Sequence, residues 1–410
     1  MAEEEIENPV VAEVSKKLTY EGAGNISDLT KNDFLELNGL LAKVYGENCV
    51  KKVKEVCDEQ LSKNKINSTA LYIAGMIALK DRSLDNSNLV YLVDLFEKYH
   101  KESLVEYICD EIIDIDPENK FALKKLAEFY KNANDNRVWA LYEKIVKIDY
   151  EEADIAKILA ERYESQGNTN TAIEYYKKSL PRFINANNMS AVKEVWTKLV
   201  SLIPEDLDFF LQIQKRIAKT LNVLKSASLM QELYMYYKNT AKWNTAIEIL
   251  KIILNIDSKD SWAKKEIVEC FREKYADHSR LEDYIRSSDL ESSFRDIFEA
   301  ISDFEKHIAF DAKSFVYHPT WKVGVIRKVQ GDQLTINFGK KHGIHEMSLE
   351  MAVKSLQPLP KNHIWVLKAT KKPEVLAEKV KKDIPWTLKT IIKSFGNRCD
   401  DKRIKQELVG

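Results

Sequence analysis

Cationic and aromatic residues alternate along residues 311–410. The paired cations are Arg327 and Lys328, Lys340 and Lys341, Lys371 and Lys372, and Lys381 and Lys382. The aromatic residues among them include Trp321, Phe338, Trp365 and Trp386. Cations neutralise phosphates and aromatic rings stack on bases, so this mixture is typical of a nucleic-acid surface. We therefore predict that the eight paired cations contact nucleic acid or a macromolecular partner; the alternative is a solvated lysine surface over core aromatics.

The sequence gives little support for metal binding, methyl-lysine binding or catalysis. The four histidines of this segment are His318, His342, His345 and His363. His342 and His345 have no third metal ligand visible in the sequence, so we expect the histidines to pack within a small domain and to bind no metal. An aromatic cage for methyl-lysine, built from Tyr317, Trp321 and Phe338, is an alternative to their packing in the core. The sequence contains no nucleophile elbow, P-loop or dinucleotide fingerprint. We expect neither catalysis nor a cofactor.

The elements that position these residues change character near Asp311. Residues 1–310 carry 43 Lys and Arg against 54 Asp and Glu, whereas residues 311–410 carry 20 against 10. Opposite charge signs predict modules with different contacts. The N-terminus is acidic where a secretory signal would be basic and then apolar, and no apolar run reaches the ~20 residues that span a bilayer. We expect a cytoplasmic protein without membrane contact.

Helix-period patterns dominate the acidic part and recur about every thirty-three residues, as in helical-repeat solenoids. The clearest repeat resembles a tetratricopeptide (TPR) unit. Its predicted packing positions are Leu159, Ala160 and Tyr163 on one helix, Gly167 in the turn, and Ala172 and Tyr176 on the next helix. Small residues at 160 and 172 would let the helices approach closely. Other repeats match poorly, so we predict an irregular, TPR-like α-solenoid without a basic peptide clamp.

Four segments follow from these patterns. Residues 1–30 are expected to be a flexible acidic N-terminus, and residues 31–310 the solenoid, closed by a helix over 281–310. Residues 311–372 predict a small β-barrel, and residues 373–410 a basic helical segment with helices at 374–382, 385–395 and 400–408. The chain is expected to be a piece of a longer protein, because the last segment ends without a terminating signal.

The predicted barrel begins with Trp321 and Gly324. Valines 323, 325 and 329 precede a turn at Gly331, and residues 334–338 alternate again, so two strands joined by a turn are expected. Residues 347–356 predict a strand end and one short helical turn, and residues 363–367 a final strand or extended segment. The pattern is similar to SH3-like and Tudor-like barrels.

The acidic helical repeats, followed by residues 318–326, 336–338, 347–352 and 356–359, resemble the N-terminal extension of the long, spirochaete-type Gre transcription elongation factors. The resemblance implies bacterial RNA polymerase as the partner. Gre factors insert a coiled coil with an acidic tip into the polymerase, where it stimulates RNA cleavage. The sequence has no such coiled coil, so no cleavage-stimulating residue is carried over to this chain.

The resulting hypothesis is a non-catalytic scaffold that tethers a transcription elongation factor to RNA polymerase or associated partners, with other proteins bound through the solenoid. A second hypothesis is a nucleic-acid-binding module in residues 311–410. A third is a TPR adaptor or co-chaperone.

Overall fold

The structure, a computed structural model, describes residues 8–19, 26–82, 87–278, 280–292 and 294–409. Its contacts divide the chain into two compact units, Met1–Leu221 and Asn222–Gly410. The predicted fold class is confirmed: a solenoid-like array of helices precedes a small antiparallel sheet and further helices. The boundary at Leu221 lies within the helical array, and the four predicted segments remain a prediction. Among the described residues, no helix combines the length and apolar character needed to span a membrane.

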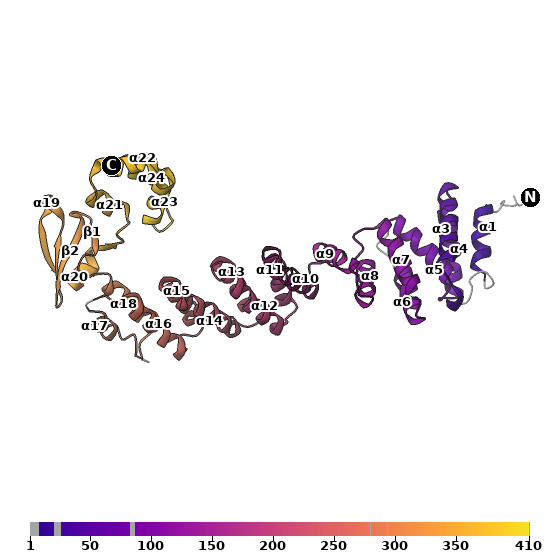
Figure 1. Cartoon of the computed structure of the whole chain (residues 1–410), viewed down its shortest axis with the longest axis horizontal. Coiled ribbons are helices and arrows are strands. Elements are labelled where there is room, and N and C mark those ends of the chain that lie inside the picture. The colour runs from indigo at the N-terminus through magenta and orange to yellow at the C-terminus, as the bar shows by residue number, and fades with distance from the viewer. Residues whose placement is uncertain (1–7, 20–25, 83–86, 279, 293, 410) are drawn as a thin grey trace, which may run out of the picture. The chain divides into compact units, whose positions relative to one another are not determined.

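In the first unit, helices that follow one another in the sequence pack against each other (Figure 1). They are α1 (Pro9–Leu18), α3 (Lys31–Gly46), α4 (Val50–Lys63), α5 (Ser68–Lys80), α6 (Ser87–Lys98), α7 (Glu102–Ile115), α8 (Lys120–Asn132), α9 (Arg137–Ile148), α10 (Ala153–Ser165), α11 (Thr169–Asn185), α12 (Met189–Leu202) and α13 (Leu207–Thr220), with a 3-10 turn at Ile26–Asp28.

Several turns between these helices share the same backbone conformation and the same kind of cap. Two positions after the ends of α8, α10 and α11, the backbone is in the left-handed region, at Asn134, Gly167 and Asn187. Asn and Gly tolerate this conformation better than other residues. After α10 and α11 the next residue, Asn168 or Asn188, caps the following helix with its side chain. Asparagine is among the best N-caps, so the sequence itself sets the sharp reversals of a helical-repeat array.

The repeat singled out in the sequence is the pair α10 and α11. Its six predicted packing positions are arranged as follows: Leu159, Ala160, Ala172 and Tyr176 are buried, Tyr163 is half-buried, and Gly167 has a φ of +77° in the turn. The Tyr163 ring stacks on Tyr175 of α11, with ring centroids 5.7 Å apart. Small residues at the crossing thus let the helices approach while tyrosines fill the space beside them.

The segment 1–30 is not wholly a flexible lead-in. Helix α1 begins at Pro9, and the Asn8 side chain accepts hydrogen bonds from the amides of Val10 and Val11. Val14 and Leu18 are buried, and α1 packs on α3 and α4. An apolar face at helical spacing behind an Asn-Pro start explains the helix. Residues 1–7 and 20–25 lie outside the described residues.

The second unit begins with further helices of the array: α14 (Val223–Asn239), α15 (Trp243–Ile256), α16 (Ser261–Lys274), α17 (Leu281–Ser287) and α18 (Ile297–Ile308). The single closing helix expected over 281–310 is therefore wrong. The segment forms two helices joined by a loop. Arg295 of this loop donates to the Ser288 carbonyl and pairs with Asp303 of α18, and these contacts fix the connection between the two helices. Asp296 then caps α18.

The sheet contains β1 (Phe315–His318), β2 (Lys322–Gln330), β3 (Gln333–Asn337), β4 (Ile344–Ser348) and β5 (Gln357–Leu359), all antiparallel in the order β4-β3-β2-β1-β5. The short helices α19 (Gly339–His342) and α20 (Leu349–Ser355) flank β4. The expected turn at Gly331 joins β2 to β3. At Gly324 an added Cβ would lie 2.6 Å from the Phe338 ring, so glycine there allows a close approach between strands.

The final strand expected at residues 363–367 is wrong, because α21 (Ile364–Thr370) is a helix. His363 caps it, its Nδ1 accepting from the Trp365 amide over 3.1 Å. The strand that completes the sheet is β5, just before it. Helices α22 (Pro373–Lys382), α23 (Ile384–Ser394) and α24 (Asp401–Val409) follow, close to the three predicted helices.

Candidate functional site

The eight candidate cations are all exposed, but they do not form one surface. Arg327 and Lys328 lie on β2, where a bulge interrupts the pairing with β3. Lys340 and Lys341 lie on α19, Lys371 and Lys372 between α21 and α22, and Lys381 and Lys382 at the end of α22. Lys341 lines one cleft, Lys381 lines another, and Lys382 pairs with Glu378 at 2.7 Å.

The cleft lined by Lys341, here called the aromatic cleft, lies between the sheet and α21 and has a volume of about 540 Å³. Its aromatic lining is Tyr317, Trp321, Phe338 and Trp365, and its cationic lining is Lys322, Lys341 and Lys368. Tyr317 comes from β1, Trp321 and Lys322 from the start of β2, and Trp365 and Lys368 from successive turns of α21. The cleft therefore depends on the contact of α21 with the sheet.

The proposed methyl-lysine cage does not form. Both neighbouring imidazoles stack on Trp321, with the His318 centroid at 4.1 Å and the His345 centroid at 3.8 Å. Phe338 is buried against Gly324. Packing of Trp321 and Phe338 with the histidines, the interpretation preferred from the sequence, explains this part of the cluster.

Tyr317 and Trp365 form the opposite part of the cleft, with ring centroids 4.4 Å apart. The Trp365 Nε1 donates to Glu407 of α24 over 3.0 Å. The same carboxylate pairs with Lys368 at 3.4 Å and Arg403 at 3.3 Å. Glu407 thus fixes α24 to the ring and the cation that α21 supplies to the cleft.

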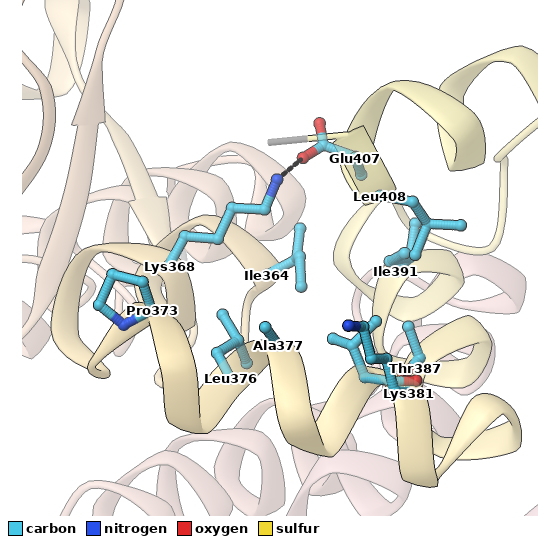
Figure 2. A pocket seen from close by; sticks show the side chains of 11 residues that line it. Ile364, Lys368, Pro373, Leu376, Ala377, Lys381, Thr387, Ile391, Glu407 and Leu408 are labelled. Carbon is cyan, nitrogen blue, oxygen red and sulfur yellow. Dashed lines mark hydrogen bonds and ion pairs between the residues drawn. The ribbon is translucent and has the colours of Figure 1, made fainter.

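A second cavity, of about 350 Å³, lies among α21, α22, α23 and α24. Figure 2 shows Ile364, Leu376, Ala377 and Ile391 around this apolar groove, with the ion pair of Lys368 and Glu407 drawn across its rim. Lys381 is a rim residue here. Helices α22 and α23 are separated by Asp383, whose carboxylate caps α23 through the Trp386 amide at 3.0 Å. Helix α23 exposes Lys389 and Lys393 beside a smaller groove.

His363 is the buried histidine of the four. Among the described residues its Nε2 has no hydrogen-bond partner. Burial lowers the pKa of His363, which keeps the imidazole neutral in the folded protein. In the part of the chain that the structure describes, no group of three or more His, Cys, Asp or Glu side chains could hold a metal ion.

The solenoid also contains a cavity, of about 440 Å³, between α6, α7 and α8. Its charged lining is mainly acidic, with Glu97, Glu102 and Glu128, and its Lys125 is paired with Glu97 at 2.6 Å. This lining offers no free cation to a peptide carboxylate.

Sequence reasoning missed Lys322 as a cleft residue, although it grouped Tyr317 with Trp321 and Phe338, and it did not place Lys368 beside these rings. The signal lies in strand pairing: Tyr317 is opposite Val323, and His318 is opposite Lys322. This register can be predicted only when β1 and β2 are recognised as a hairpin. Lys368 follows Trp365 by three positions, a helical neighbour that a predicted strand could not supply.

A family model, the GRAD helix-turn-helix domain, matches residues 365–410. The chain is 48% identical over 376 residues to the "Putative GreA-associated domains protein" of Treponema pallidum, covering 92% of this chain and 57% of that protein. It is 38% identical over 375 residues to "Transcription elongation factor GreA" of Borreliella burgdorferi, covering 91% of this chain and 41% of that protein. The chain thus spans about half the length of these relatives. A solved chain, "MamA RS-1 ArsTM double mutant", aligns with 53% of this chain at 11% identity and a TM-score of 0.17, too weak to bear on the fold.

Proposed function

From the premise that this chain is a homologue of the long, spirochaete-type Gre factors, as its sequence predicts, we propose that it is a non-catalytic scaffold that tethers a Gre-type factor to RNA polymerase. The observation that carries the proposal is the identity of 48% and 38% over nine-tenths of the chain to proteins named for GreA. Because those proteins are longer, the matched region is one part of a larger factor.

The architecture supports an interaction role. A stack of helices presents an extended surface, and repeat proteins use such surfaces to bind other proteins. The second unit adds two cavities whose lining residues come from different elements, the aromatic cleft and the apolar groove. A role beside polymerase also places the protein in the cytoplasm, which is part of the proposal.

A direct binding assay tests the tethering. The purified chain is immobilised and exposed to purified bacterial RNA polymerase core enzyme, with an unrelated acidic protein immobilised as the control. We expect saturable retention of polymerase by the chain and none by the control. Equal retention by both would contradict the proposal.

A transcript-cleavage assay tests the non-catalytic part. Backtracked elongation complexes are incubated with the chain alone, with a Gre factor alone, or with both. We expect the chain alone to leave the cleavage rate unchanged, because it supplies no acidic coiled-coil tip. Stimulation of cleavage by the chain alone would show that it is more than a scaffold.

A further inference from the structure

The geometry points to the aromatic cleft as a binding site for single-stranded nucleic acid. In this assignment a base lies against the wall formed by Tyr317 and Trp365, and Lys322 and Lys341 contact the phosphates. The inference does not rest on the tethering proposal, because it concerns a ligand of the isolated chain.

The charge of the cleft favours a polyanion. Its cations come from three elements, with Lys322 on β2, Lys341 on α19 and Lys368 on α21. Among the described residues, none that lines the cleft carries a carboxylate. Lys368 is partly neutralised by Glu407, whereas Lys322 and Lys341 form no ion pair with a described residue. Two cations are therefore available to phosphates, and the same cations would repel a methylated lysine.

The rings favour unpaired bases over a duplex. Aromatic side chains stack on bases in single strands, whereas a duplex hides the faces of its bases in its own stack. Both faces of Trp321 are covered by His318 and His345, whereas Tyr317 and Trp365 lie against each other with centroids 4.4 Å apart, so a base would lie against the outer side of this ring pair. The volume of about 540 Å³ lies within the range of about 300–1,000 Å³ typical of ligand sites.

Lys322 is held beside the Tyr317 ring. At the start of β2 its φ is +62°, and several other described residues besides glycine also have a positive φ. Its Nζ donates to the Pro319 carbonyl over 2.9 Å and lies 5.9 Å from the centre of the Tyr317 ring. These contacts place a cation beside the ring that would receive a base.

The test uses the full chain and fluorescein-labelled oligo(dT) and oligo(rU) of about eight nucleotides, a length suited to a single binding groove. Affinity is measured by fluorescence anisotropy between about 50 and 200 mM salt. The double variant Lys322→Asn/Lys341→Gln removes two cleft cations, and Asn tolerates the left-handed backbone. We expect at least about tenfold weaker binding and a log–log salt slope shallower by about 1.4, since each phosphate contact on a single strand contributes about 0.7.

The control variant Arg327→Gln/Lys328→Gln removes two exposed cations that do not line the cleft. We expect a loss of affinity much smaller than that of the cleft variant. The inference is overturned by an equal loss in both variants, by no binding at low salt, by tighter binding of a duplex than of a single strand, or by equal competition from polyglutamate, which would indicate an acidic protein partner. Circular dichroism shows whether each variant is folded. None of these outcomes bears on polymerase retention, which is measured separately.

Discussion

At the scale of single residues, Gly75 lies at a close approach of α5 and α6 in the first unit. An added Cβ at this position in α5 would lie 2.5 Å from Leu89 Cγ and 2.8 Å from its Cδ2, on α6. Because Leu89 is itself buried, it has little room to move. We predict that Gly75→Ala destabilises the protein by about 1–3 kcal/mol, as measured by urea unfolding followed by circular dichroism.

Gly39 provides the matched control for this substitution. It is exposed in α3 of the same unit, and a Cβ there meets nothing within 4 Å. Gly39→Ala should raise stability by about 0.5–1 kcal/mol, because alanine loses less backbone entropy in a helix. If both variants were equally stable, the close approach of α5 and α6 would be wrong.

His363 predicts a pH-dependent stability for the C-terminal helices. Burial lowers the pKa of His363 below its ordinary value of 6.5. The unfolded chain therefore takes up a proton first as the pH falls below about 6.5, and the stability that the neutral imidazole contributes is lost as the pH falls further. We predict that the protection factors for hydrogen exchange in residues 364–395, which are corrected for the slower intrinsic exchange at lower pH, fall between pH 7 and pH 5.

Substitution by asparagine tests this assignment. His363→Asn retains an N-cap side chain but does not titrate, so it should remove most of the fall in the protection factors. His100→Asn removes an exposed histidine in the first unit and should leave that fall in place. An unchanged pH response in His363→Asn would assign the effect to another group, such as His278, whose pKa burial also lowers.

At the scale of elements, Arg182 joins three helices of the solenoid. It is buried on α11 and donates to the carbonyls of Val146, in the last turn of α9, and Glu152, before α10, each over 2.9 Å. Helix ends leave such carbonyls without helical partners. We predict that Arg182→Met lowers the free energy of unfolding by about 1.5–3 kcal/mol in urea titrations.

The comparison for this variant is Arg216→Met, on α13. Arg216 is exposed and donates to the Asn185 side chain over 2.8 Å. Removing the Arg216 guanidinium should change the free energy of unfolding by no more than about 0.5 kcal/mol. Similar effects of the two substitutions would mean that Arg182 does not hold the helix ends together.

Elements with strong local signals could be predicted from the sequence. The pair α10 and α11 has a helical apolar face on each side of a turn at Gly167, so its packing positions were visible. Helices α22 to α24 were predicted within a few residues, because Pro373, Pro385 and Asp400 mark their starts. In each case the helical spacing of the apolar residues and the residues at the helix ends predict the same element.

Elements with conflicting signals were missed. Residues 363–367 combine β-branched and aromatic types and were interpreted as a strand, yet the His363 cap and packing on the sheet make α21 a helix. Strand β5 has only three residues, one of them a proline, so its alternation cannot be seen. The candidate site was only partly predictable for the same reason. Lys341 was identified, but Lys322 and Lys368 reach the cleft through a strand register and a helix that the sequence did not predict.

At the scale of the whole molecule, charge separates along the chain. Residues 1–310 have 54 acidic residues against 43 basic ones, while residues 311–410 have 20 basic residues against 10 acidic ones. The compact units divide elsewhere, at Leu221, so the second unit contains both acidic helices and the basic sheet and helices. Contacts to polyanions are therefore expected from part of one unit, and protein contacts from the helical array.

The central claim, that this chain tethers a Gre-type factor to RNA polymerase, is tested most directly in cells. The chain carries an affinity tag at its chromosomal locus, and it is purified from cell extract after thorough nuclease digestion, with an untagged strain as the control. We predict that RNA polymerase subunits are recovered with the tagged protein and resist nuclease. Recovery no greater than in the untagged strain would contradict the account.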